Sequence, residues 1–158
     1  MAAVAVISDT HLPRGSRRLS DECLRVLGGA ELILHAGDFV AEGVLVELEE
    51  LAPIAGVHGN MDDAALKTRL PARRLVEVAG LRIGMVHDAG PRAARTERLL
   101  GWFPGCDVVV YGHTHMAELE RRDGCWLLNP GSPTERRRAP SRTMAVVDRG
   151  VPRIVPLA

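Results

Sequence analysis

Apolar residues gather along this chain in short runs, and each run ends directly in a polar residue. Because apolar and polar positions do not alternate within the runs, we expect strands that are buried on both faces. Five such strands are predicted, at residues 3–7, 32–34, 54–57, 81–86 and 108–111. Helices are predicted between them, at residues 20–27, 42–51, 62–70 and 92–103. This alternation indicates an α/β fold whose sheet is at least partly parallel.

The last third of the chain has a different pattern, in which short strands follow one another without helices. These strands are predicted at residues 117–122, 125–128, 143–148 and 153–155. Asp123-Gly124 and Arg149-Gly150 are typical of tight turns between antiparallel strands, so this part predicts an antiparallel addition. Since no linker or repeat interrupts the sequence, we expect residues 1–158 to form a single domain.

Each of the five expected strands is followed by an aspartate, histidine or asparagine. Ligands of open α/β sheets bind outside the carboxyl ends of the strands, so these side chains should meet at one edge. One such residue alone is more often a turn former or a hydrogen-bonded structural residue. That explanation does not account for five strand ends of the same kind. We interpret the set as a metal site made of Asp9, His11, Asp38, Asn60, His87, His113 and His115.

The residue types in this set suit two divalent ions. Imidazole and carboxylate ligands together favour Mn, Fe, Co, Ni or Zn over Mg bound by oxygen alone. Residues i and i+2 of an extended segment point the same way, so Asp9 with His11, and His113 with His115, can converge. The carboxylates of Asp9 and Asp38 leave part of the metal charge uncancelled, and this charge would hold an anionic phosphate ester.

The order of these residues resembles the calcineurin-like metallophosphoesterase superfamily. Its pattern appears in this chain as Asp9/His11, Gly37-Asp38, Gly59-Asn60, His87 and Gly112-His113-Thr114-His115. The short length and the segment NPGSPTERR resemble the compact prokaryotic phosphodiesterase subgroup. The resemblance implies a two-sheet β-sandwich flanked by helices, and it covers almost the whole chain.

The same resemblance implies a role for each residue. One ion would be held by Asp9, His11, Asp38 and His115. The other ion would be held by Asp38, Asn60, His87 and His113. Asp38 would bridge the two ions, and a hydroxide that they share would attack phosphorus in line with the leaving oxygen. Asp38, Asn60 and His113 are the predicted catalytic residues, and Mn is the expected ion, with Fe, Ni, Co and Zn as alternatives.

The predicted activity is hydrolysis of phosphodiester bonds. The first alternative is a broad phosphomonoesterase. The second is a non-catalytic scaffold, similar to the retromer subunit that uses the same fold for protein contacts. Because that scaffold has lost ligand character and this chain carries the complete set, the sequence favours an enzyme.

The chain also departs from the superfamily pattern at three positions. Met61 stands where many members have a histidine that is assigned as the general acid. Asp62 could supply the missing proton or could cap the next helix. His87 is followed by Asp88 instead of the common Gly-His, which changes the expected substrate contacts. Ala41 replaces the tyrosine ligand of purple acid phosphatases, so no iron–tyrosinate site is expected.

Composition narrows the classes of partner. The formal net charge of the 158 residues is zero and aromatic residues make up 3%. With neither a basic field nor rings for stacking bases, we expect no general nucleic-acid binding and a small phosphoester as substrate. No run approaches the ~20 apolar residues of a membrane span, so no membrane association is expected. A cytoplasmic protein is predicted, and a homo-oligomer stays open.

Several residues outside the pattern have two interpretations. His35 and His58 could orient ligands or be buried structural histidines. Residues 129–132 could line the site with backbone groups or form an ordinary turn. Arg136-Arg137-Arg138 with Arg142 could reach a phosphate, although such a run is usually solvated. The remaining residues are interpreted as buried apolar side chains: Cys23, Trp102, Phe103, Cys106 and Cys125.

Overall fold

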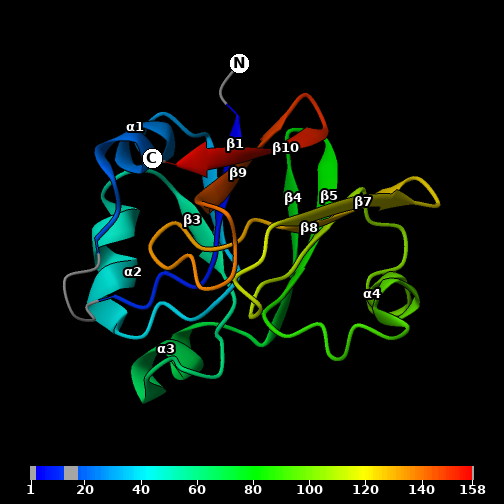
Figure 1. The fold of residues 1–158 in the computed structure, drawn as a ribbon, viewed down its shortest axis with the longest axis horizontal. Coiled ribbons are helices and arrows are strands. Elements are labelled where there is room, and N and C mark those ends of the chain that lie inside the picture. Colours follow the sequence, from blue (N-terminus) through cyan, green and yellow to red (C-terminus); the bar gives the residue numbers. More distant parts are fainter. Residues whose placement is uncertain (1–2, 13–17, 158) are drawn as a thin grey trace.

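Two five-stranded sheets pack face to face, and the short apolar runs form their central strands (Figure 1). The computed structural model describes residues 3–12 and 18–157. The first sheet has the order β10 (Val151–Leu157), β9 (Arg142–Asp148), β1 (Val4–Ile7), β2 (Leu32–His35) and β3 (Ile54–Gly56). The second has the order β4 (Arg73–Val78), β5 (Leu81–Val86), β6 (Val108–Val110), β8 (Cys125–Asn129) and β7 (Glu118–Arg122).

The central strands are parallel and are buried on both faces. β1, β2 and β3 pair in parallel, and so do β5, β6 and β8. Along β1, Val4 and Val6 join the core between the sheets, whereas Ala5 and Ile7 face the opposite way, into the core of the helical layer. This two-residue period explains why β1 contains no polar position: each face of the strand meets its own apolar layer.

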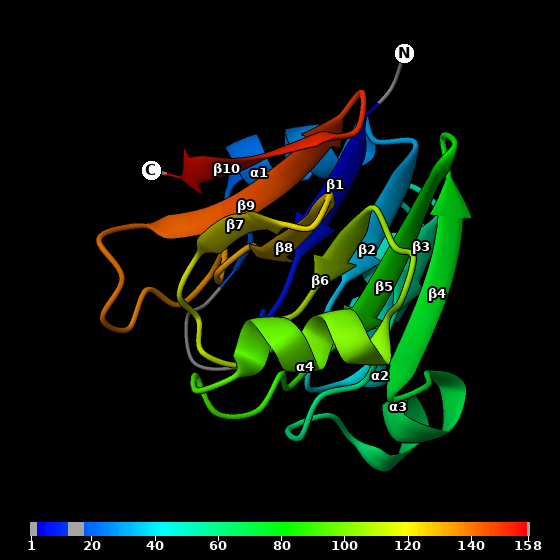
Figure 2. The same ribbon diagram turned by 90° about the vertical axis from the view of Figure 1, so that its right-hand side faces the viewer.

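Within residues 3–12 and 18–157, four helices flank the sandwich: α1 (Asp21–Gly28), α2 (Glu42–Glu49), α3 (Ala64–Arg69) and α4 (Arg95–Trp102). Figures 1 and 2 show α1 and α2 on one side and α4 on the other. The Ser20 hydroxyl accepts a hydrogen bond from the Cys23 N–H at 3.2 Å and caps α1. The predicted helices and the two-sheet β-sandwich are therefore confirmed. α3 and α4 are shorter than predicted at both ends, α2 ends two residues early, and α1 is shifted by one residue.

One strand was not predicted from the sequence. β4 (Arg73–Val78) pairs antiparallel with β5 at the edge of the second sheet, and its residues alternate between exposed and half-buried. An edge strand with one solvated face contains no continuous apolar run, so the search for such runs passed over it. Ala79 and Gly80, both at positive φ, make the tight turn into β5.

The antiparallel pairing of β7 with β8 and of β9 with β10 is confirmed, although β8 also pairs in parallel with β6. Asp123-Gly124 joins β7 to β8, and Arg149-Gly150 joins β9 to β10, each with positive φ at both residues. β10 is longer than the predicted residues 153–155, because it continues through Pro152 and Pro156. Proline has no N–H to donate, and β10 lies at a sheet edge where that loss is tolerated. Within the described residues, no helix is long and apolar enough to cross a membrane.

Candidate metal centre

The seven residues singled out from the sequence meet at the carboxyl ends of the parallel strands. The loops after β1, β2 and β3 carry the members from the first sheet: Asp9, His11, Asp38 and Asn60. The loops after β5 and β6 carry the members from the second sheet: His87, His113 and His115. Six of the side chains sort into two groups, and within each group the ligand atoms lie within 4.8 Å of one another.

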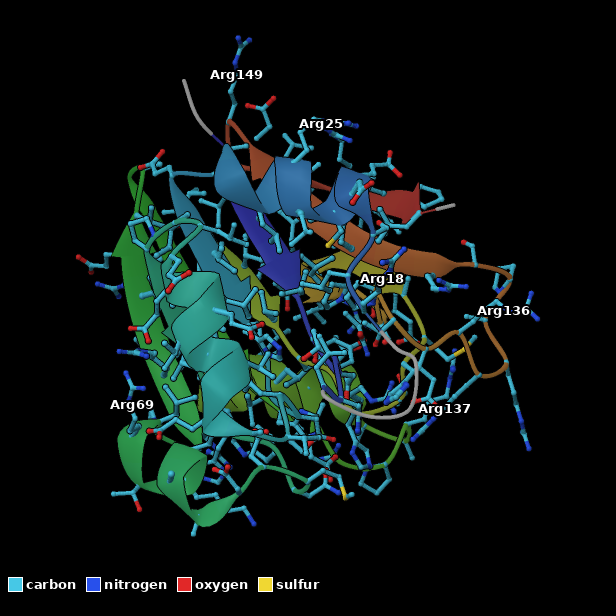
Figure 3. All side chains as sticks on the ribbon, turned by 90° about the vertical axis from the view of Figure 1, so that its left-hand side faces the viewer. Arg18, Arg25, Arg69, Arg136, Arg137 and Arg149 are labelled. Carbon is cyan, nitrogen blue, oxygen red and sulfur yellow. The ribbon has the colours of Figure 1, made fainter. Side chains whose placement is uncertain are left out.

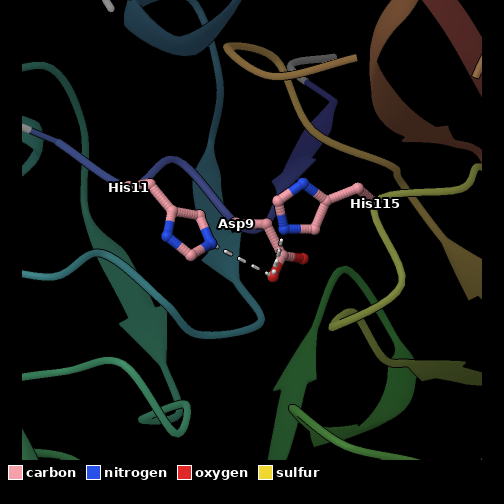
Figure 4. A group of neighbouring side chains, drawn as sticks. All are labelled: Asp9, His11 and His115. Atoms are coloured by element: carbon pink, nitrogen blue, oxygen red, sulfur yellow. Dashed lines mark ion pairs between the residues drawn. The ribbon is translucent and has the colours of Figure 1, made fainter. Parts of the chain in front are cut away.

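The first group consists of Asp9, His11 and His115 (Figure 4). Asp9 Oδ1 lies 3.4 Å from His115 Nε2 and 3.8 Å from His11 Nε2. All three residues are buried, and Asp9 is fully so, at 0% exposed. The group therefore points a carboxylate oxygen and two imidazole nitrogens at one small volume.

The second group consists of Asp38, His87 and His113. Asn60 belongs beside it, because its side-chain Oδ1 lies 3.1 Å from His87 Nε2. His113 and Asn60 are exposed, whereas Asp38 and His87 are buried. This group forms the open side of the centre.

Asp38 lies between the two groups. Its Oδ2 is 3.4 Å from His11 Nε2 of the first group and 3.3 Å from His87 Nε2 of the second. Its other oxygen, Oδ1, accepts a hydrogen bond from the Met61 N–H at 2.8 Å. One oxygen of Asp38 thus faces both groups at once, while the other anchors the neighbouring loop.

The donor set fits divalent cations. Asp9 Oδ1 and His11 Nε2 are buried and have no hydrogen-bond partner among the described residues. Buried polar atoms in proteins are otherwise almost always hydrogen-bonded, and a bound ion accounts for atoms that are not. Imidazole nitrogens with carboxylate oxygens are typical ligands of Mn, Fe, Co, Ni and Zn.

The electrostatics keep both carboxylates ionised. Burial by itself raises the pKa of Asp9, yet the nearby His11, His115 and His87 lower it below its usual range. Burial also raises the pKa of Asp38, but the nearby His87 outweighs it and the pKa is lowered. Burial lowers the pKa of His87, but the two carboxylates outweigh it and raise the pKa to about 9. The site is arranged to hold positive charge.

Five members of the centre have left-handed backbone. Positive φ angles are found at Asp9, His11, Asp38, His113 and His115. Residues other than glycine rarely adopt such angles, and they cluster at functional sites. The extended-backbone argument for the paired residues is therefore wrong in its mechanism, and His113 and His115 join different groups. That division is the one implied by the family resemblance.

Asp62 ties the loops of the centre together from beneath. It is 5% exposed and accepts hydrogen bonds from the N–H groups of Asp38 at 3.0 Å, Val40 at 2.8 Å and Gly59 at 2.7 Å. With its oxygens turned toward these donors, it does not face the open side. The helix cap is Asp63, which accepts from Leu66 N–H at 2.9 Å. The interpretation of Asp62 as a helix cap is therefore wrong.

Two glycines let the chain approach the ligands closely. A Cβ at Gly59 would collide with the Asp38 carboxylate, and one at Gly112 would collide with Ser8 Oγ. Next to Gly112, the His113 N–H donates a hydrogen bond to Asp9 Oδ2 at 3.0 Å. Both positions require glycine, because a side chain there would displace Asp38 or the Ser8-Asp9 segment.

The segment after β8 braces the centre with side chains. Ser132 Oγ donates to Asp9 O at 2.8 Å, and Thr134 Oγ1 donates to Thr10 O at 2.7 Å. Asn129 Nδ2 donates to Thr114 Oγ1 at 3.1 Å, inside the loop that carries His113 and His115. From the sequence, this segment was interpreted either as an ordinary turn or as a backbone lining of the site. The hydrogen bonds made by the side chains of Asn129, Ser132 and Thr134 were not predicted.

His35 is a buried structural histidine that supports the same loops. Its Nε2 lies 3.1 Å from Thr10 Oγ1, its Nδ1 accepts from Gly37 N–H at 3.1 Å, and its ring stacks on Phe39. Complete burial lowers the pKa of His35 to about 3, so the ring is neutral. His35 thus holds Thr10, the residue after Asp9, and Gly37, the residue before Asp38.

A cavity of about 340 Å³ opens beside the second group. His58, Asn60 and His87 line it together with Lys67, the only lysine of the chain. Lys67 Nζ lies 3.5 Å from Asn60 O at its rim. A second cavity of about 510 Å³ lies between α1 and α2 and contains none of the candidate ligands.

For the arginine run, Phe103 and the three cysteines, the structure agrees with the plain structural interpretation. Arg136, Arg137 and Arg138 are exposed, and Figure 3 shows Arg136 and Arg137 on the loop that precedes β9. Phe103 is buried against the second sheet. The three cysteines are free and buried: Cys23, Cys106 and Cys125.

Comparison with known proteins identifies the family of the chain. A sequence profile of the calcineurin-like phosphoesterase superfamily domain matches residues 2–150. The chain belongs to this superfamily. A probable metallophosphoesterase of Methanothermobacter thermautotrophicus is 41% identical over 134 residues, which are 83% of this chain and 77% of that protein.

A further relative and a solved structure of similar fold differ in how they are named. A phosphodiesterase of Methanocaldococcus jannaschii is 29% identical over 145 residues, 81% of this chain and 82% of that protein. The crystal structure of Vps29 of Chaetomium thermophilum superposes with a TM-score of 0.80 at 21% identity, covering 94% of this chain and 82% of that one. The second likeness concerns the fold alone. Membership of a metallophosphoesterase family and the two ligand groups indicate a phosphoesterase with a divalent metal centre.

Proposed function

We propose that this protein hydrolyses phosphodiesters at a centre of two divalent ions. The observation that carries the proposal is the position of Asp38 Oδ2, within 3.4 Å of His11 Nε2 and within 3.3 Å of His87 Nε2. A carboxylate oxygen placed between two ligand groups suits a bridge between two ions. Mn is the ion that we propose, with Fe, Ni, Co or Zn as alternatives.

The ligands follow the two groups. The first ion would be held by Asp9, His11, His115 and Asp38. The second ion would be held by Asp38, Asn60, His87 and His113. When bound, the ions would polarise the phosphoryl oxygens and lower the pKa of the water that attacks phosphorus.

The residues themselves determine where the substrate sits. Because Asp9 and His115 are almost fully buried, the first group is closed, and the ester must approach over exposed Asn60 and His113. Only Asp9 and Asp38 bring negative charge, so the loaded centre keeps a positive charge for the anionic ester. We propose Asp38, Asn60 and His113 as the catalytic residues on this basis.

The cavity beside the second group supports a diester as substrate. A diester carries two organic groups on phosphorus, so one of them must be accommodated while the other leaves. The space of about 340 Å³ next to Asn60 and His87 is within the range of small-molecule sites. A monoester would leave it unused, which is why the phosphomonoesterase is the second candidate.

Activity of metal-stripped protein with added Mn, Ni, Zn or Mg tests the proposal. We expect Mn to restore hydrolysis of bis(p-nitrophenyl) phosphate, with lower turnover of p-nitrophenyl phosphate. Asp38→Asn should abolish the activity, whereas Asp148→Asn, at an exposed position of β9, should leave it unchanged. Turnover of the monoester alone would favour the phosphomonoesterase, and neither turnover nor metal binding would favour a scaffold.

Three further proposals concern the whole chain. Residues 1–158 are proposed to form one metallophosphoesterase domain, since the profile match spans both sheets. A cytoplasmic location is supported by the three free, buried cysteines. A net charge of zero supports a small phosphoester as partner without general nucleic-acid binding.

A further inference from the structure

Glu135 lies against His115 on the side that faces away from the first ligand group. His115 Nε2 is 3.4 Å from Asp9 Oδ1, whereas its Nδ1 is 3.6 Å from Glu135 Oε2. The ring is 1% exposed, and it is held between two carboxylates. Each ring nitrogen therefore has its own acidic neighbour.

The two nitrogens must play different parts if His115 binds a cation. A neutral imidazole carries one N–H, so an Nε2 that gives its lone pair to an ion leaves the proton on Nδ1. His115 Nδ1 is buried and makes no hydrogen bond within the described residues. At 3.6 Å the Glu135 carboxylate is at ion-pair distance, and a small rotation would let it accept the Nδ1 proton.

The other buried imidazoles of the centre have different neighbours at Nδ1. His87 Nδ1 lies 2.7 Å from the backbone oxygen of Ala36, which already fixes that ring. His11 Nδ1 has no hydrogen-bond partner in the described part of the chain. A carboxylate beside Nδ1 thus distinguishes His115 from both.

The position of Glu135 is set by the segment that braces the centre. Its backbone N–H donates to Ser132 Oγ at 3.0 Å, and Ser132 Oγ donates in turn to Asp9 O at 2.8 Å. Its Oε1 lies 3.8 Å from Arg137 Nε, on the exposed arginine loop. The backbone of Glu135 is therefore fixed relative to Asp9, the residue on the other side of the His115 ring.

We propose that Glu135 is a positioning residue for the first metal site. It holds the proton of His115 on Nδ1 and aims Nε2 at the ion, and Arg137 steadies the carboxylate. This inference rests on the proposed function, because it requires an ion at the first group. Carboxylates that accept the free N–H of a metal-bound histidine typically contribute about 10- to 100-fold in metal affinity.

Zinc affinity measured by competition with a chromophoric chelator tests the proposal. Glu135→Ala should weaken one of two Zn²⁺ sites by about 10- to 100-fold and leave the other unchanged. Glu135→Gln keeps an acceptor oxygen and should weaken the same site less. Glu97→Ala is the matched control, because Glu97 pairs with Arg122 on the surface and should not affect either site.

The Nδ1 proton of His115 gives a second readout that a purely structural role would not move. In the zinc-loaded protein, where the ion occupies Nε2, long-range ¹H–¹⁵N spectra should show the Nδ1–H resonance of His115 further downfield in the unchanged chain than in Glu135→Ala. An unchanged Nδ1–H resonance, unchanged zinc affinity in Glu135→Ala, or a weakening explained by loss of stability in the metal-free protein would overturn the proposal. Failure of the unchanged chain to bind zinc would instead overturn the proposed function.

Discussion

At the scale of single residues, the ligands are aimed by neighbours that the sequence did not mark. The ligand residues themselves could be predicted, because metal chemistry requires particular side chains at particular strand ends. The parts played by Asp62 and Ser132 could not, since each depends on which backbone groups the folded loops bring within 3 Å of it. Asp62 and Asp63 are adjacent carboxylates with different roles, and nothing local to the sequence separates them.

Asp62→Ala should lower the free energy of unfolding more than Asp63→Ala does. Without Asp62, the N–H groups of Asp38, Val40 and Gly59 lose their acceptor, and we expect a loss of about 2–4 kcal/mol. Asp63→Ala removes a helix cap and should cost about 1 kcal/mol. Urea unfolding of both metal-free variants measures the difference. Equal losses would contradict the bracing role of Asp62.

Met61 should make the rate depend steeply on the leaving group. Its side chain is 41% exposed beside Asn60 and has no proton to give to the departing oxygen. Asp62 is turned toward backbone N–H groups and cannot replace it. A positioned general acid typically contributes about 10²–10⁴-fold, so Met61→His should accelerate the cleavage of esters with poor leaving groups.

The slope of log(kcat/KM) against leaving-group pKa, for a series of aryl and alkyl diesters, measures this effect. Met61→Leu is the control and should keep the steep slope, whereas Met61→His should flatten it. A shallow slope in the unchanged enzyme would show that another group supplies the proton.

At the scale of elements, the central strands could be predicted and the edges could not. Each central strand needs apolar residues on both faces, so β1, β2, β5 and β6 are visible as runs. In the edge strand β4, exposed and half-buried residues alternate, and β10 contains two prolines, so the sequences of both strands resemble loops. How a helix meets a sheet is equally hidden, because it depends on single close contacts such as the one between Gly84 of β5 and Phe103 after α4.

Gly84→Ala should destabilise the contact between α4 and the second sheet. An added Cβ would lie 2.5 Å from Phe103 Cδ1 and 2.6 Å from Cγ, and the buried ring has little room to move. We expect the free energy of unfolding to fall by about 1–3 kcal/mol. Gly101→Ala, in α4 with no atom within 4 Å of the new Cβ, should raise it by up to about 1 kcal/mol. Urea unfolding measures both changes, and free energies of unfolding that changed in the same direction in both variants would refute this account.

At the scale of the whole molecule, the metal centre lies where the two sheets meet. Each ligand group takes side chains from loops of both sheets: Asp9 and His11 join His115, and Asp38 joins His87 and His113. The sequence predicts these residues one strand at a time, but their division between two sheets appears only in the fold. An ion in either group would therefore connect the halves of the sandwich.

Metal binding should stabilise the whole domain, and Asp38 should control most of the effect. An ion that binds only the folded state adds about 2.7 kcal/mol per site at a free concentration of 100 times its Kd. Because Asp38 faces both groups, Asp38→Ala should lose nearly all of the rise that Mn²⁺ gives, whereas His115→Ala should lose about half. Glu97→Ala is the control, because Glu97 pairs with Arg122 on the surface, outside both groups, and this variant should keep the full rise. Urea unfolding of each variant with and without Mn²⁺ measures the rise against its own metal-free state, so a direct effect of the substitution cancels. If Asp38→Ala kept more than half of the rise, the two ions would not share this carboxylate, and each group would have to bind its ion independently.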